Sequence, residues 1–356
     1  QELYSWYLQS PEYRILVKNL TEASFSERPS DKIGKTVAKI LYGEISPYSA
    51  TRLERFAACA FAHFLQYGLK IEERQEYEFR QADLGNVIHQ ALEQFSRNLK
   101  KNQLTWRSLT DQERDQLIDT SVEETIHDYG NTILESSARN QYMILRVKRI
   151  LRRTVWALQQ QLKAGKYEPS RFEISFSMEE DLKASNFQLS EDERLRLRGR
   201  IDRVDRYEED DTIYVKVIDY KSGNTALDLT SVYHGLQLQL IVYLNAALEL
   251  EEKNHPGKHA EPAGMFYYHV KDPLVDGKPG DEEEEIERKL LEKLKVDGLV
   301  RAEEKILKDL DRELEAGKKS LVIPAAYNKN GSLSSRSKTA SKEQFEELCT
   351  YVNDKI

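Results

Sequence analysis

The most informative segment of this sequence reads Thr212-Ile213-Tyr214-Val215-Lys216-Val217-Ile218-Asp219-Tyr220-Lys221. Its β-branched and aromatic residues predict a strand. Asp219 and Lys221 lie two positions apart, so their side chains share one face of an extended segment. An unpaired charge at the end of so apolar a strand is costly. We therefore expect both charged side chains to have partners.

A second carboxylate ends a similar strand upstream, in Gly199-Arg200-Ile201-Asp202. One divalent metal ion held by Asp202 and Asp219, with Lys221 beside it, would satisfy these charges, because hard cations bind carboxylate oxygens. The alternative is a buried Asp–Lys ion pair on a purely structural strand. The spacing alone leaves both interpretations open.

The composition indicates a globular protein. Of 356 residues, 32% are charged and 39% are hydrophobic, and no stretch approaches the roughly 20 apolar residues of a membrane span. The two cysteines, Cys59 and Cys349, do not form a disulfide framework and predict a reducing, cytoplasmic compartment. The chain begins at Gln1 rather than methionine, which indicates a fragment of a longer protein.

Charge and motif content exclude two classes of function. A net charge of −8 argues against a protein that coats nucleic acid through its overall field, so any DNA contact must use local basic patches. No Gly-x-x-x-x-Gly-Lys-Ser/Thr loop occurs in the sequence, so we expect no ATPase site in this chain.

Helical periodicity dominates the first half of the chain, where apolar residues recur at spacings of three and four. A cluster of cations, including Arg149 and Arg153, lies outside the apolar face of one of these helices. Such a cluster is usually a solvated helix face, but it would also guide a phosphate backbone above a nuclease cleft. We expect helices over residues 49–67 (with Ser49 as a cap), 84–99, 112–129 and 140–163.

After Pro169 the period changes from 3.6 to 2, which predicts strands. Phe172, Ile174, Phe176 and Met178 alternate as a half-buried strand. The order of elements predicts a mixed α/β core behind a helical insertion. We expect strands over residues 172–178, 195–204, 212–221, 265–271 and 321–328, and helices over residues 228–250 and 283–294 and from Ser341.

Three further residues are candidates for the site around Asp202 and Asp219. Gln239 is expected on the apolar helix face that contains Val232 and Leu236, where its amide needs a hydrogen-bond partner. The partner would be a metal-bound water, a DNA phosphate or simply a backbone carbonyl. His89 lies beside an apolar helix face, where a packed or surface role is the alternative to metal binding. The backbone carbonyl of Tyr220 is a further hard oxygen ligand.

Four segments together resemble the RecB-type branch of the PD-(D/E)xK nucleases, in that family's order. They are Leu84-Gly85-Asn86-Val87-Ile88-His89, Gly199-Arg200-Ile201-Asp202-Arg203, Ile218-Asp219-Tyr220-Lys221 and the helix with Gln239 and Tyr243. The resemblance implies a restriction-endonuclease-like α/β core, a mixed central sheet flanked by helices, with a large helical insertion.

Other segments are similar to the AddB/RexB family, the second subunits of Gram-positive helicase–nucleases. The resemblance implies residues 1–45 as a remnant of a preceding domain and residues 46–356 as the nuclease domain, helical over about 46–165 and α/β over about 166–356. The segments are Ser49-Ala50-Thr51-Arg52-Leu53-Glu54-Arg55-Phe56, Phe61-Ala62-His63-Phe64, Tyr67-Gly68-Leu69, residues 262–273 and Asn328-Lys329-Asn330-Gly331-Ser332.

The resemblance also implies roles for the candidate residues. His89, Asp202, Asp219 and the Tyr220 carbonyl would bind Mg²⁺ or Mn²⁺, which polarises a phosphate and activates water. Lys221 would stabilise charge in the transition state, with Gln239 positioning it. The candidates for DNA contact are Arg200, Arg203, Tyr243, Arg149, Arg153 and Arg336.

The resemblance further implies a [4Fe–4S] cluster that holds the nuclease domain together. Cys59 matches the first ligand, although Ala60 follows it where proline is usual. A cluster takes four ligands, and Cys349 fits a buried thiol better. We therefore expect the cluster only in a full-length protein whose sequence continues beyond Ile356.

The resemblance implies a metal-dependent DNA exonuclease that resects double-strand breaks for recombinational repair. It would cut the 5′-terminated strand of single-stranded DNA that an AddA-like helicase–nuclease partner unwinds, with no membrane involved. The alternative is a catalytically silent DNA-binding or assembly module of the same fold. Intact Asp202, Asp219 and Lys221 argue against that alternative.

Overall fold

The computed structural model describes residues 2–25, 32–43, 45–72, 81–128, 137–176, 182, 186–188, 194–278, 280 and 282–356. The chain divides into two compact units, Gln1–Gly43 and Glu44–Ile356. The first contains three helices where the sequence shows no clear period: α1 (Glu2–Gln9), α2 (Arg14–Phe25) and α3 (Lys35–Tyr42).

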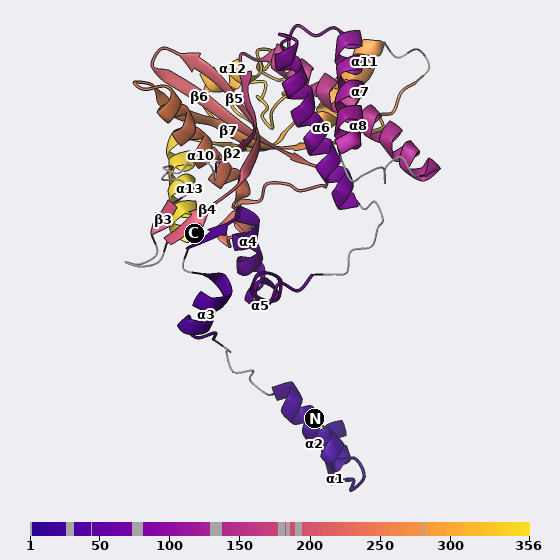
Figure 1. Ribbon diagram of the computed structural model, residues 1–356, viewed down its shortest axis with the longest axis vertical. Helices are drawn as coiled ribbons and strands as arrows, with labels where there is room; N and C mark the ends of the chain where they lie inside the picture. Colours follow the sequence, from indigo (N-terminus) through magenta and orange to yellow (C-terminus); the bar gives the residue numbers. More distant parts are fainter. Residues whose placement is uncertain are drawn as a thin grey trace. The chain divides into compact units, whose positions relative to one another are not determined.

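A six-stranded mixed sheet forms the centre of the second unit (Figure 1). Its strands are β2 (Glu168–Ser175), β5 (Arg200–Glu209), β6 (Thr212–Lys221), β7 (His259–His269), β8 (Asp297–Arg301) and β9 (Thr339–Ala340). They lie in the order β2-β5-β6-β7-β8-β9. The central strand β6 pairs antiparallel with β5 and parallel with β7, so it is enclosed on both edges.

A small three-stranded sheet accompanies the main one. Its strands are β1 (Ile45–Tyr48), β3 (Asn186–Gln188) and β4 (Arg194–Leu197), in the order β1-β4-β3. The predicted strand over residues 195–204 is therefore wrong as a single element: it is β4 and β5, which belong to different sheets. They separate at Gly199, where a Cβ would lie 2.4 Å from the Phe176 ring.

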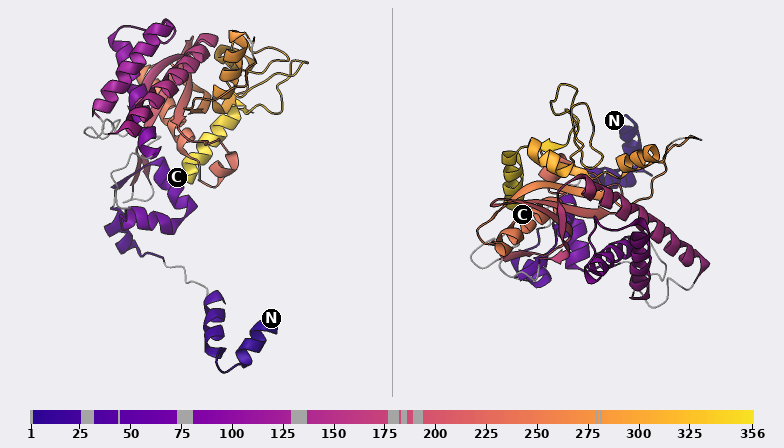
Figure 2. Two further views of the ribbon diagram at one scale, coloured as in Figure 1. Left: turned by 90° about the vertical axis from the view of Figure 1, so that its right-hand side faces the viewer. Right: turned by 90° about the horizontal axis from the view of Figure 1, so that it is seen from above.

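Helices cover both faces of the main sheet (Figures 1 and 2). They are α6 (Gln81–Lys101), α7 (Asp111–Asp128), α8 (Ala138–Ala164), α10 (Gln239–Asn254) and α13 (Lys342–Lys355). Alternation along β6 sends Val215 and Val217 into the core under α10 and α13, while Ile218 and Tyr220 join the core under α6, α7 and α8.

The predicted helices of the first half are confirmed, with one break. Ser49 caps the first of them, since Arg52 N donates to its Oγ at 3.1 Å. The helix over residues 49–67 is interrupted at Cys59, whose backbone is extended. The segment forms α4 (Ala50–Ala58), α5 (Ala60–His63) and the π-helix η1 (Phe64–Gly68).

The single helix predicted over residues 228–250 is wrong. The structure has α9 (Leu229–Tyr233) and then a turn before α10, with Gly235 at φ +75°. Gln239 is consequently the first residue of α10 rather than a continuation of the face that carries Val232 and Leu236. A left-handed glycine ends the first helix, as expected for the residue with no Cβ.

The C-terminal region departs from the prediction as well. Residues 321–328 form no strand and take part only in isolated bridges, Lys319 with Ala326 and Tyr327 with Leu333. The final helix α13 is confirmed and begins with a capping box between Ser341 and Gln344. Helix α11 (Glu283–Leu294) is also confirmed, while β8 and α12 (Glu304–Leu310) are elements that the periodicity did not reveal.

A buried ionic cluster lies on the face of the sheet toward α6–α8. The Arg203 guanidinium donates two hydrogen bonds to Asp205, at 2.5 and 2.9 Å, and Lys216 Nζ lies 3.2 Å from the same carboxylate. Arg203 is 1% exposed and lies over the Trp106 ring. The prediction that Arg203 contacts DNA is therefore wrong, because its charge is used inside the core.

Within the part of the chain that the structure describes, no helix has the length and apolar character needed to cross a bilayer.

Candidate active site

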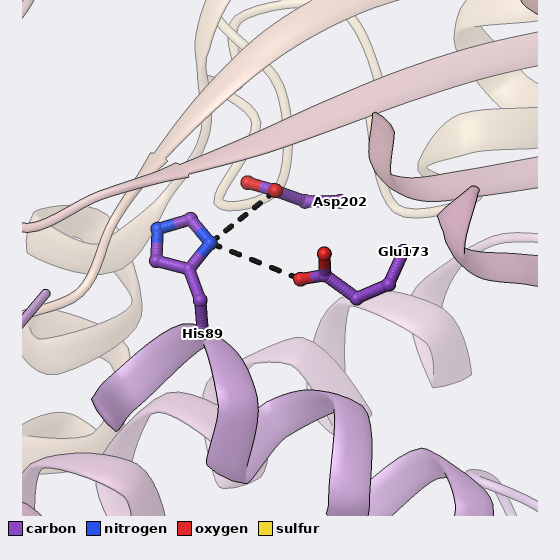
Figure 3. Close-up of side chains that lie close together, drawn as sticks. All are labelled: His89, Glu173 and Asp202. Carbon is purple, nitrogen blue, oxygen red and sulfur yellow. Dashed lines mark ion pairs between the residues drawn. The ribbon is translucent and has the colours of Figure 1, made fainter. Parts of the chain in front are cut away.

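Three side chains from separate elements converge at one end of the main sheet (Figure 3). They are His89 of α6, Glu173 of β2 and Asp202 of β5, and one ligand atom from each lies within 4.8 Å of the others. His89 Nδ1 is 3.2 Å from Asp202 Oδ1 and 3.9 Å from Glu173 Oε1. The structure thus brings two of the predicted metal ligands together with a third that was not predicted.

Glu173 is the residue that sequence reasoning missed. Between Phe172 and Ile174 it occupies a polar position of an alternating strand, which predicts a solvated side chain. Register shows otherwise: Phe172 pairs with Arg203 and Ile174 with Ile201, so Glu173 lies opposite Asp202. Its side chain is only 3% exposed.

The backbone of Glu173 is strained, with φ +48°. A residue other than glycine costs about 1–3 kcal/mol in such a conformation, and such outliers cluster at functional sites. Because Glu173 has a Cβ and no turn requires it here, the strain indicates that the carboxylate is held toward the site for a reason other than stability.

A second group of side chains forms a chain of hydrogen bonds on the strand β6 and helix α10. Lys221 Nζ lies 2.6 Å from Asp219 Oδ2 and donates to Gln239 Oε1 at 2.8 Å. The Gln239 amide donates to Asp219 Oδ1 at 3.0 Å and to the Tyr243 hydroxyl at 2.9 Å. Lys221 Nζ also lies 5.3 Å from the centroid of the Tyr267 ring.

The two groups are joined through the backbone of β6. Tyr220 N donates to Asp202 Oδ2 at 2.7 Å, which fixes Asp202 next to the strand that carries Asp219 and Lys221. The Asp202 carboxylate thus uses one oxygen toward β6 and the other toward His89. Lys221 is 25% exposed, in contrast to the buried carboxylates, so the ammonium group is the member most accessible to a substrate.

Burial and mutual repulsion perturb the acids of the site. Burial, followed by the charge of Asp202, raises the pKa of Asp219 to about 7, against the opposing effect of Lys221. The same two causes raise the pKa of Glu173 to about 8, although Arg200 and His89 oppose them. Burial alone would lower the pKa of His89, but the carboxylates of Asp202, Glu173 and Asp219 outweigh it and raise it.

These acids fit a cation. One imidazole and two carboxylates within 4.8 Å of one another are a ligand set that divalent metals accept. The raised pKa values of Glu173 and Asp219 report a local excess of negative charge, which a bound cation would relieve. Asp219 turns its oxygens toward Lys221 and Gln239, and its metal-binding role stays a prediction, as does that of the Tyr220 carbonyl.

The predicted DNA contacts have different surroundings. Arg200 is 52% exposed and forms an ion pair with Glu173, while Arg149 and Arg153 of α8 both face Asp272. Arg336 is exposed in a loop. Their contacts with DNA stay predictions. The prediction that Tyr243 contacts DNA is wrong, since its ring is 7% exposed and packs against Phe176.

The two cysteines do not make a cluster site in this chain. Cys59 is exposed and begins α5, where its Sγ accepts from Ala62 N at 3.5 Å. Cys349 packs in the core beside α10, and burial raises the pKa of its thiol to about 12. Two thiols are fewer than the four ligands of a [4Fe–4S] cluster, so the cluster stays a prediction for a longer protein.

Comparison with curated proteins finds relatives along the whole chain, all named as the second of two "ATP-dependent helicase/deoxyribonuclease" subunits. The chain is 43% identical over 99% of its length to the protein of this name from Lachnoclostridium phytofermentans. Those from Alkaliphilus metalliredigens and a Thermoanaerobacter species are 38% and 36% identical over 99% and 100% of this chain. The chain spans about 30% of the length of each of these relatives.

A family model described as "PD-(D/E)XK nuclease superfamily" matches residues 47–355. This range holds His89, Glu173, Asp202, Asp219, Lys221 and Gln239, together with the mixed sheet that positions them. With a match over most of its length, the chain belongs to the PD-(D/E)XK nuclease superfamily.

Proposed function

We propose that this chain is the catalytic part of a Mg²⁺-dependent deoxyribonuclease that degrades single-stranded DNA at double-strand ends. The observation that carries the proposal is the chain of contacts from Lys221 through Gln239 to Asp219, beside the cluster of His89, Glu173 and Asp202. A structural ion pair needs only Asp219 and Lys221. The additional acids and the amide are what phosphodiester hydrolysis requires.

His89, Asp202 and Glu173 would hold the divalent cation, with Asp219 as a further ligand. When bound, the cation supplies Lewis acidity toward the scissile phosphate and favours ionisation of a water molecule. Lys221 presents its ammonium to the substrate, where it stabilises the negative charge that develops on the phosphate. Gln239 holds Lys221 in the orientation that this requires.

A groove next to the metal-binding cluster offers a path for a DNA strand. Its volume is about 680 Å³, and it runs between α6 and β2 with Glu173 in its wall. Arg97, Lys100 and Arg171 line it, as does the Trp106 ring. Cations that contact phosphates, together with aromatic rings, are typical of grooves for single strands.

The broader assignment rests on the relatives. Their name contains both a helicase and a deoxyribonuclease, whereas this chain has no phosphate-binding loop of the P-loop type. We propose that an AddA-like partner supplies ATP-driven unwinding and that this chain trims the 5′-terminated strand for recombinational repair. Cleavage of end-labelled duplexes by the assembled complex, with the label at either terminus, tests the strand preference.

The alternative is a DNA-binding or assembly module of the same fold without catalysis. It would explain the fold and the groove but leaves unexplained why Asp202, Asp219 and Lys221 are all present. It predicts DNA binding that is unaffected by removal of the Lys221 ammonium.

Replacing Lys221 by methionine is expected to lower kcat for cleavage of single-stranded DNA by about 10²–10³, the usual cost of losing one transition-state charge partner. The measurement is Mg²⁺-dependent release of nucleotides from a 5′-labelled oligonucleotide, with EDTA as the metal-free reference. The matched control is Lys258→Met, because Lys258 pairs with Glu208 near the opposite end of the β6–β7 pair. Equal activity of the two variants would contradict the proposed role of Lys221.

Metal binding is expected to release protons in a pH-dependent manner. Glu173, with its pKa of about 8, and Asp219, with a pKa of about 7, are partly protonated at neutral pH and must ionise to bind a cation. Proton release per Mn²⁺ should therefore be large at about pH 6.5 and small at about pH 9, and affinity should rise over that range. Calorimetry in buffers of different ionisation enthalpy measures it, and a pH-independent affinity would contradict the ligand set.

A further inference from the structure

Helix α10 begins without a cap of its own. Its N-cap residue is Leu238, whose side chain has no hydrogen-bonding atom, and the first helical residue is Gln239. The leading N–H groups of a helix need acceptors from outside the helix. Here both Leu238 N and Gln239 N donate to one oxygen, Oε1 of Glu54, at 2.7 and 3.0 Å.

Glu54 comes from α4, far upstream in the sequence, and its own position is well determined. Ser49 caps α4, and Leu53 packs against the core beside α10. The turn before α10 lies against the same helix, since a Cβ on Gly235 would be 3.3 Å from Ala57. A carboxylate at this end of α10 is also favoured by the helix dipole.

The residue whose backbone Glu54 holds is the one that organises the catalytic lysine. Gln239 contacts Lys221, Asp219 and the Tyr243 hydroxyl through its amide side chain. The reach of that side chain is set by where its backbone lies. Because Glu54 Oε1 fixes the Gln239 N–H, a shift at Glu54 moves the amide relative to Lys221 and Asp219.

We propose that Glu54 is a positioning residue of the nuclease site: through Gln239 it holds Lys221 and Asp219 in register for catalysis. This inference rests on the proposed function. It concerns the rate of the chemical step, because Glu54 bonds the start of α10 and belongs neither to the cluster of His89, Glu173 and Asp202 nor to the lining of the groove beside Glu173.

The test compares three substitutions of Glu54 with a neighbour on the same helix. Glu54→Ala removes the acceptor and is expected to lower kcat by about 10- to 100-fold, as loss of outer-shell partners does. Glu54→Asp has a side chain too short to keep both bonds and should lose a similar factor. Glu54→Gln retains an acceptor oxygen and should recover most of the activity. Arg55→Ala, at an exposed position of α4, is the control.

A positioning role and a merely structural role differ in what else changes. We expect KM for the oligonucleotide and Mn²⁺ affinity to stay at the wild-type values in Glu54→Ala, while kcat falls for the folded protein, quantified by circular dichroism. Wild-type kcat in Glu54→Ala, failure of Glu54→Gln to recover activity, or a loss that simply follows the unfolded fraction would each overturn the inference. An inactive wild-type chain would instead contradict the proposed function itself.

Discussion

Asp219→Asn is expected to reduce Mg²⁺-dependent DNA cleavage by at least about 10³-fold, because it removes an anionic oxygen from the cation site together with the partner of Lys221. The substitution is nearly isosteric, so the hydrogen bond from Gln239 to Oδ1 has an equivalent acceptor. The loss therefore reports charge rather than shape. Nuclease assays on a labelled single-stranded oligonucleotide measure it.

The same substitution is expected to leave the metal-free protein at least as stable as the wild type at about pH 8. The folded-state pKa of Asp219 is raised to about 7 by burial and by Asp202, above an unfolded value of about 3.9. The folded state thus binds the extra proton between these values, and wild-type stability falls as pH rises through about 7. A neutral asparagine avoids that cost.

Thermal melting with and without Mg²⁺ completes the test. Wild type should melt several degrees higher with saturating Mg²⁺, since a ligand that binds only the native state stabilises it. Asp219→Asn should show a much smaller increase. Asp228→Asn is the matched control, because Asp228 caps α9 and asparagine is also a good cap. A purely structural Asp–Lys pair predicts the reverse, a less stable variant with no change in metal response.

Asp205→Ala is expected to have the largest effect on stability, a loss of about 3–5 kcal/mol, because removing one partner of a buried ionic cluster leaves the others uncompensated. Asp205 is fully buried and is the shared partner of Arg203 and Lys216. Urea or thermal unfolding measures the loss. Asp211→Ala, at an exposed turn position, should change stability by less than about 0.5 kcal/mol.

The pH dependence of this difference has a defined sign. Burial alone would raise the pKa of Asp205, but Arg203 and Lys216 outweigh it and lower the pKa. A lowered folded pKa gives stability that is present above the unfolded value of about 3.9 and is lost as pH falls through the folded value. The gap between wild type and Asp205→Ala should therefore persist at about pH 5–8 and shrink only below about pH 4.

A triple replacement separates charge from packing. Arg203→Met, Lys216→Met and Asp205→Leu together remove every charge of the cluster while keeping apolar volume, and such changes are often neutral. We expect this variant to be more stable than Asp205→Ala alone. If it is equally unstable, the effect of Asp205→Ala is one of lost packing around the Trp106 ring rather than of uncompensated charge.

The outcomes for individual residues show which kinds of inference a sequence supports. His89, Asp202, Asp219, Lys221 and Gln239 do lie together, and their segments were identified from local signals and from order along the chain. Gln239 was nonetheless expected in the middle of a long helix. The structure makes it the first residue of α10, because the glycine at position 235 adopts a left-handed conformation that periodicity does not report.

Arg203 and Glu173 were misjudged for one shared reason. Each is a charged residue in an alternating strand, where the polar positions normally face water. The main sheet is covered by helices on both faces (Figure 1), so neither face of β5 is available to solvent along most of its length. Arg203 is consequently paired inside the core, and Glu173 is turned into the site.

The amino-acid sequence by itself determined the local elements: the apolar strand that ends in Asp219 and Lys221, the helix that presents His89, and the serine caps at positions 49 and 341. Periodicity and capping act over a few residues, so they can be read along one segment. Only the tertiary structure decided that Glu173 faces Asp202 and that Glu54 holds the start of α10. Those contacts depend on strand register and on helix packing between distant segments, and no local pattern of residues encodes which faces will meet.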